Sequence, residues 1–101
     1  MSEPIPDKAQ VSIDFPDKFY MGSFGRESRF DVAADQEGLH IHLDRPGDEK
    51  RHVGFHVHHS MLVVLLRAMG DALSDAQDLS SQQRQEIRDA LDYIAQRVVA
   101  D

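Results

Sequence analysis

Apolar and polar residues alternate along much of the first part of the chain. An apolar side chain at every second position is typical of a strand that buries one face. The pattern occupies four runs: residues 11–15, 30–34, 39–43 and 52–57. Proline follows the first run at Pro16, and turn-forming residues at 35–38 and 44–48 separate the later runs. Residues 16–28 mix aromatic residues with glycines, so we expect irregular backbone or an edge strand there.

The second part of the chain has a helical pattern. We predict one helix from Met61 to about Ser74, with Ser60 as its N-cap, and its first two turns are apolar all round. A second helix is predicted to begin near Ser80, because Ser80 and Gln83 have the spacing of a capping box. Its apolar residues form a narrow seam suited to helix–helix packing. The loop at 75–79 is short, so the two helices should be antiparallel neighbours.

These elements predict an α+β fold. A three- to four-stranded antiparallel sheet is followed by a C-terminal antiparallel helical hairpin that packs on one face of the sheet. We expect a single domain over residues 10–101, preceded by a flexible N-terminal tail over residues 1–9.

Loop lengths determine which residues face one another across the predicted sheet. A four-residue loop at 35–38, with glycine last, places Asp31 opposite His42. A five-residue loop at 45–49 keeps the apolar residues of the next strand on the same face, and it places His42 opposite His52. The predicted core face then consists of Phe30, Val32, Leu39, Ile41, Leu43, Val53, Phe55 and Val57.

The other face of this sheet gathers histidines. All six histidines lie within residues 40–59, and four of them fall on this face: His40, His42, His52 and His56. Directly opposed residues have Cβ atoms about 4.5–5.5 Å apart. The side chains of Asp31, His42 and His52 can therefore converge on one metal ion such as Zn²⁺ or Ni²⁺, which makes this row a candidate metal site with His40 and His56 as further candidate ligands. A solvated face, a subunit interface and a pH-responsive surface are the alternatives.

Composition limits the possible partners. The chain has 101 residues and a formal net charge of −7, with 18 acidic against 11 basic residues. We therefore expect neither nucleic-acid binding nor attraction to an anionic membrane. Protonation of all six histidines would raise the formal charge to −1, so self-repulsion depends on pH. The lack of cysteine excludes disulfides and thiolate ligands, and we expect a cytoplasmic location without a secretory signal.

The first helix carries more apolar surface than one sheet and one narrow seam can cover. We therefore predict a homodimer with this helix, or the helical hairpin, near the two-fold axis. The predicted interface residues are Leu62, Leu65, Leu66, Met69, Leu73, Leu91, Ile94 and Val98.

Three classes of function follow from these features. The first is a non-enzymatic, homodimeric protein-interaction or regulatory module, for which a further protein partner is a candidate. The second is a metal-binding or pH-sensing module that uses the histidine-rich sheet face. The third is a small enzyme, for which no nucleophile, base and orienting group can be placed together, so we assign no catalytic residue.

Overall fold

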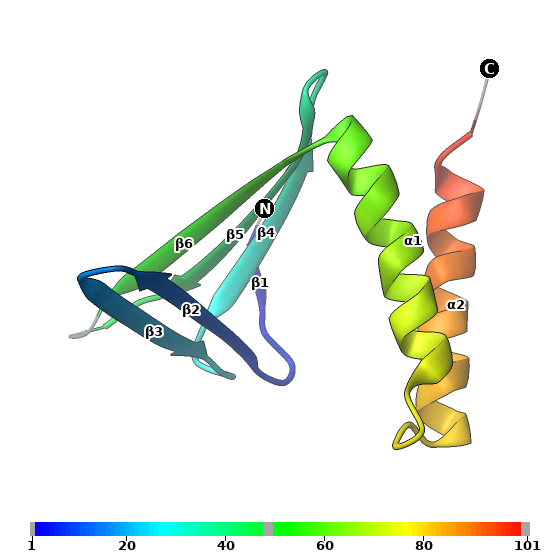
Figure 1. Cartoon of the computed structure of the whole chain (residues 1–101), viewed down its shortest axis with the longest axis horizontal. Coiled ribbons are helices and arrows are strands. Elements are labelled where there is room, and N and C mark those ends of the chain that lie inside the picture. The colour runs from blue at the N-terminus through cyan, green and yellow to red at the C-terminus, as the bar shows by residue number, and fades with distance from the viewer. Residues whose placement is uncertain (1, 48–49, 100–101) are drawn as a thin grey trace. The chain divides into compact units, whose positions relative to one another are not determined.

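The computed structural model describes residues 2–47 and 50–99 of the chain, in which strands precede two helices (Figure 1). The elements are β1 (Glu3–Pro4), β2 (Ala9–Phe15), β3 (Lys18–Phe24), β4 (Arg29–Ala34), β5 (Gly38–Arg45), β6 (Arg51–His58), α1 (His59–Asp75) and α2 (Ser81–Arg97). This confirms the α+β class and the order of elements. The chain divides into two compact units, Met1–Leu66 and Arg67–Asp101. Neither helix is long and apolar enough to cross a membrane.

The first unit contains two separate sheets. A four-stranded antiparallel sheet has the order β1-β4-β5-β6, and β2 pairs only with β3. β2 ends just before Pro16, as predicted, and β3 occupies most of the segment for which irregular backbone or an edge strand was expected. Glu3 and Pro4 pair with β4, so part of the expected tail is hydrogen-bonded to the sheet.

A small core lies where β1, the end of β3 and the turn before β4 meet. Phe24 and Ile5 are buried, with 2% and 7% of their surfaces exposed. The amide of Ile5 donates to the carbonyl oxygen of Ser28 at 3.0 Å, and the amide of Ser28 donates to the carbonyl oxygen of Gly25 at 2.9 Å. Ser28 is fully buried, and its Oγ has no hydrogen-bond partner among the described residues.

The predicted core residues do share one face of the sheet, but they are not buried. The pairing places Ile41 opposite both Val32 and Phe55, so these apolar side chains share one face of the sheet. They remain half-buried or exposed, with Val32 at 50% and Phe55 at 41% exposure. The buried core of this unit is the corner around Phe24 instead.

The pairing of β5 with β6 differs from the prediction by two residues. The loop between them again has five residues, but it follows Arg45 and ends before Arg51, which face each other. Ile41 consequently faces Phe55 rather than Val53, and His42 faces Gly54 rather than His52. Because the shift is even, every side chain keeps its predicted face. The predicted loop residues 48–49 lie outside the described part of the chain.

The two helices begin differently. α1 starts at His59, directly after β6, so Ser60 lies in its first turn and the predicted N-cap role of Ser60 is wrong. Before α2, the predicted capping box is present: Ser80 Oγ accepts from the amide of Gln83 at 3.1 Å, and Gln83 Oε1 accepts from the amide of Ser80 at 2.9 Å.

Within the second unit, one side chain of α2 binds the end of α1. The guanidinium of Arg84 donates to the carbonyl oxygens of Leu73, at 3.1 Å, and Ala76. Carbonyl groups at the end of a helix lack intrahelical partners, and a cationic side chain there satisfies them. Arg84 therefore connects the two helices across their short loop.

The buried hydroxyl of Ser28 provides a test of this corner. In Ser28→Ala we expect an unchanged or higher free energy of unfolding, by at most about 1–3 kcal/mol, because the substitution removes a buried polar group without a partner. Urea denaturation measures this change. Phe24→Ala is the control and should lower stability by about 3–5 kcal/mol through the cavity it creates. A clear loss of stability in Ser28→Ala would show that the Ser28 hydroxyl does have a stabilising partner.

Candidate functional site

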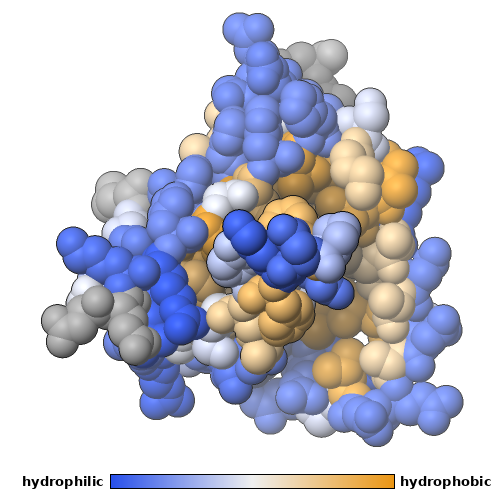
Figure 2. Space-filling model, turned by 60° about the vertical axis from the view of Figure 1, so that its left-hand side comes forward, coloured by the Kyte–Doolittle hydropathy of each residue, from blue (hydrophilic) through white to orange (hydrophobic). Residues whose placement is uncertain are grey.

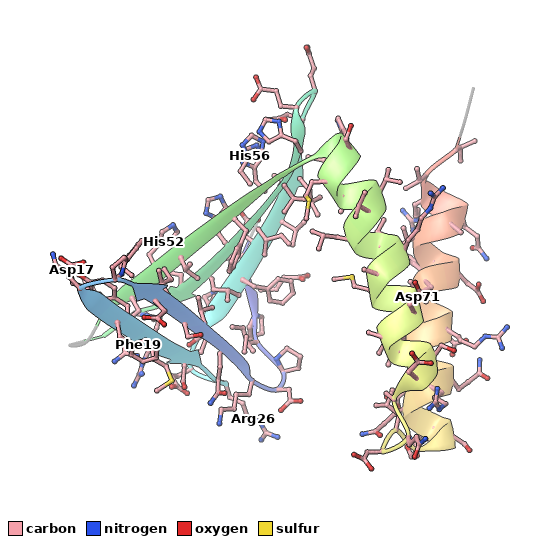
Figure 3. All side chains as sticks on the ribbon, viewed as in Figure 1. Asp17, Phe19, Arg26, His52, His56 and Asp71 are labelled. Atoms are coloured by element: carbon pink, nitrogen blue, oxygen red, sulfur yellow. The ribbon has the colours of Figure 1, made fainter. Side chains whose placement is uncertain are left out.

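Three histidine rings lie in contact on one face of the four-stranded sheet, two of them stacked and the third tilted. His40 of β5 faces His56 of β6, and their ring centroids lie 3.9 Å apart with an angle of 17° between the ring planes. His58 lies two residues further along β6, hence on the same face, and its ring centroid is 4.4 Å from that of His56. Figure 3 shows His56 on β6 near the loop between β4 and β5, with His52 further along the same strand.

The loop between β4 and β5 brings a carboxylate to this stack. Asp35 Oδ1 accepts from the amides of Glu37, at 2.8 Å, and Gly38, at 3.1 Å. His40 Nε2 lies 2.8 Å from Asp35 Oδ2, so this nitrogen donates to the carboxylate. The amide of Glu37 and the imidazole of His40 lower the pKa of the Asp35 carboxyl below its ordinary value. Asp35 is therefore a charged acceptor with a fixed orientation.

Gly38 makes this loop possible. Its φ of +155° lies in a region that favours glycine, and a Cβ at this position would overlap the carbonyl oxygen of Val57. The predicted role of Gly38 in the hairpin is therefore confirmed. Gly38 also faces His58, so the sheet face beside the His58 imidazole carries no opposing side chain.

The first residue of α1 also contacts the loop. His59 Nε2 lies 2.9 Å from the carbonyl oxygen of Gln36. Since a carbonyl oxygen only accepts, the His59 ring must carry its proton on Nε2. This hydrogen bond fastens the loop that carries Asp35 to the start of α1.

Two overlapping groups of side chains can hold a metal ion. In the first, one ligand atom each from Asp35, His40 and His56 lies within 4.8 Å of the others, and in the second the same holds for Glu37, His56 and His58. The histidines come from adjacent strands and the carboxylates from the loop above them. Donors of this kind bind Zn²⁺ at about 2.0–2.2 Å, which places two donors of a tetrahedral ion roughly 3.3 Å apart, so the rings must rotate to bring the donor atoms closer together.

The predicted metal-binding row is only partly formed. Asp31 does face His42, as predicted, but His42 faces Gly54, and His52 faces Asp44. The direct row of Asp31, His42 and His52 is therefore wrong, although His42 and His52 are diagonal neighbours with ring nitrogens 3.4 Å apart. The other two predicted ligands, His40 and His56, do lie together.

The sequence prediction missed three members of the cluster: Asp35, Glu37 and His58. Asp35 and Glu37 were assigned to turn formation alone, although both lie in the loop that precedes His40. His58 was not included in the predicted sheet face, whereas it is the last residue of β6. The alternation of His56 and His58 along one strand was the available signal.

A groove of about 500 Å³ also lies in the first unit, away from the histidine stack. Apolar side chains of β2 and β3 line one side, and Lys50, Arg51 and His52 line the other. Figure 2 shows apolar surface exposed among hydrophilic side chains, and Phe19 and Met21 of β3 are more than half exposed. Among the described lining residues there is no carboxylate, serine or threonine, so the groove offers apolar and cationic contacts.

Comparison with known proteins gave no match: no protein-family model, curated protein or solved structure is similar to this chain. The function is therefore inferred from the geometry of the histidine face.

The lowered pKa of Asp35 predicts a pH-dependent contribution to stability. A carboxyl whose pKa is lower in the folded than in the unfolded chain stabilises the fold above its unfolded pKa, about 3.9, and this contribution disappears as the pH falls through the folded value. In metal-free protein we expect Asp35→Asn to be less stable than the original chain at neutral pH. The difference should shrink below about pH 4.

Urea denaturation at several pH values, in the presence of a chelator, measures this difference. Asp7→Asn, at an exposed acid outside the sheet, is the control and should show a smaller change. Equal destabilisation by Asp35→Asn at neutral and acidic pH would rule out a contribution from the carboxylate charge.

Proposed function

We propose that this protein is a small binding module that takes up a divalent transition-metal ion, zinc or nickel, through Asp35, His40 and His56. The observation that supports this most is the convergence of three donor atoms from a loop and two strands to within 4.8 Å. Imidazole and carboxylate are ordinary ligands of zinc, and imidazole also suits nickel. The formal net charge of −7 further favours a cation.

The stack of rings constrains how an ion can bind. The lone pair of an imidazole nitrogen lies in the ring plane, and the planes of His40 and His56 are nearly parallel. One of the two rings must therefore rotate before both can direct a nitrogen at the same ion. His56 is exposed, whereas His40 is half-buried and hydrogen-bonded to Asp35, so we expect the His56 ring to move.

Asp35 can act in either of two ways when the ion binds. It can coordinate the ion directly, or it can keep its hydrogen bond to His40 Nε2 and leave His40 Nδ1 as the ligand. Glu37 and His58 form the second group with His56 and provide alternative donors. In each arrangement the coordinating nitrogens must be unprotonated, so protons compete with the metal ion for them.

A homodimeric interaction or regulatory module is the second candidate. It is supported by α1, on which Met61, Val63 and Val64 are each at least half exposed and Leu66 is exposed on the same helix. Exposed apolar surface of this extent is typical of a protein–protein contact. The absence of cysteine agrees with the cytoplasmic location that we infer for either function.

Metal titration of the full chain tests the first proposal. We expect Zn²⁺ to bind saturably and to shift the ring NMR signals of His40 and His56 together. His56→Gln should weaken the affinity by about 10–100-fold, because it removes one of the three donors. His52→Gln is the matched control, since it removes an imidazole from the same strand and face but leaves the three donors in place.

Two results would contradict this proposal. One is the absence of any saturable shift at His40 and His56. The other is equal weakening by His52→Gln and His56→Gln, which would indicate diffuse binding to an acidic surface.

Size-exclusion chromatography with light scattering tests the second candidate. We expect twice the chain mass at micromolar concentration, and Leu66→Glu should convert the dimer to a monomer because it places a charge on the apolar helix. Gln96→Glu, at an exposed position of α2, is the control and should leave the mass unchanged. A monomer of the unsubstituted chain would exclude the homodimer.

A further inference from the structure

Two histidines outside the first cluster direct ring nitrogens at each other. His42 Nδ1 lies 3.4 Å from His52 Nε2, and the ring centroids are 5.3 Å apart. We propose that His42 and His52 form a second site for a divalent transition-metal ion, separate from the first. The two sites share no ligand, so this inference goes beyond the proposed function and does not rest on it.

The distance between the two nitrogens already suits a shared ion. Two imidazole nitrogens bound at about 2.0–2.1 Å to a tetrahedral ion lie about 3.3 Å from each other. The separation between His42 and His52 therefore needs almost no contraction for a tetrahedral ion, and about 0.5 Å for adjacent positions of the tetragonal geometry that Cu²⁺ prefers, in which two such nitrogens lie about 2.8–2.9 Å apart. In this respect the second pair differs from the stacked rings of His40 and His56, of which one must rotate.

Gly54 provides the space for this pair. It faces His42 across the sheet, and a Cβ on Gly54 would lie 3.2 Å from His42 Nδ1 and 3.3 Å from His42 Cε1. The imidazole of His42 thus lies over the position where any other residue would carry a side chain. The glycine lets the ring lean along β6 toward His52, its diagonal neighbour.

A carboxylate favours the protonation state that metal binding needs. Asp44 faces His52 directly, and its Oδ1 lies 3.9 Å from His52 Nδ1. This distance is too long for a hydrogen bond, but the negative charge favours a proton on Nδ1. The lone pair of His52 then resides on Nε2, the nitrogen that faces His42. A carboxylate beside the outer nitrogen of a histidine ligand is a common arrangement in metal sites.

The donor set indicates which metal binds most tightly. Two imidazoles fill only part of the coordination sphere, and water can reach the remaining positions, since the side chains of His52 and Asp44 are both 61% exposed. Such an open nitrogen site imposes little geometry, so affinity should follow the general order for divalent ions, in which Cu²⁺ exceeds Ni²⁺ and Zn²⁺. We therefore expect the second site to take Cu²⁺ in preference to Zn²⁺.

Copper titration of the full chain tests this inference. Cu²⁺ is paramagnetic, so binding should broaden the ring NMR signals of His42 and His52 at substoichiometric concentration. His42→Gln and His52→Gln should each weaken this binding event by about 10–100-fold. His56→Gln is the reciprocal control and should leave it unchanged, because His56 belongs only to the first cluster.

Gly54→Ala tests the geometry without removing a ligand. Because the added methyl group meets the His42 ring, we expect weaker Cu²⁺ binding with both histidines still present. Circular dichroism before titration verifies that Gly54→Ala keeps its fold. If Gly54→Ala does not fold, His42→Gln and His52→Gln still test the site.

Unchanged Cu²⁺ affinity in His42→Gln and His52→Gln would overturn the inference. If His56→Gln abolished the broadening of the His42 and His52 signals by Cu²⁺, the proposal that the second site is separate from the first would also be wrong.

Discussion

The antiparallel pairing of β5 with β6 is the constraint on which the rest of the first unit depends. Side chains alternate between faces along each strand, so a loop with an odd number of residues keeps the apolar residues of both strands on one face and the imidazoles on the other. The observed loop has five residues, and it places His40 opposite His56 and Gly54 opposite His42. Both candidate metal sites follow from these two pairs, one from the direct contact of two rings and the other from the space above a glycine.

The turn between β4 and β5 gives the first site a property that the second lacks. Two backbone amides donate to the Asp35 carboxylate, independently of its contact with His40. Gly38 adopts the positive φ that the turn requires and that glycine tolerates best. The carboxylate is therefore oriented by backbone hydrogen bonds that do not depend on a metal ion. His42 and His52 receive no comparable support from a turn, and Asp44 acts on them only through its charge at 3.9 Å. The first site is thus organised by backbone structure, and the second by side-chain packing over Gly54.

Much of this arrangement could be predicted from the sequence, and the errors have identifiable causes. Alternation predicted β2, β4, β5 and β6 with their faces, and the Ser80 capping box predicted the start of α2, whereas β1 lies in the expected tail and β3 in the segment for which irregular backbone or an edge strand was expected. The hydrophobic pattern is unchanged by a shift of two residues, so it could not distinguish a five-residue loop after Asp44 from one after Arg45. Ser60 has the chemistry of an N-cap, but β6 continues directly into α1 and leaves it inside the helix. Asp35 was missed as a ligand because the same carboxylate explains the turn.

The spacing of the histidines makes the pairing of imidazoles less sensitive to register than the placement of carboxylates. In the observed register His40 faces His56 directly, and His42 and His52 are diagonal neighbours. A shift of two residues, as the sequence had suggested, exchanges these roles, because His42 would face His52 and the other pair would become diagonal. Both registers therefore retain two imidazole pairs on the same face. The partner of Asp44 does change, because only the observed register places it opposite His52, whereas Asp31 faces His42 in both registers. It follows that the sequence pattern specifies the pairing of imidazoles on one face, whereas the register determines which rings are directly opposed and which carboxylate lies beside them.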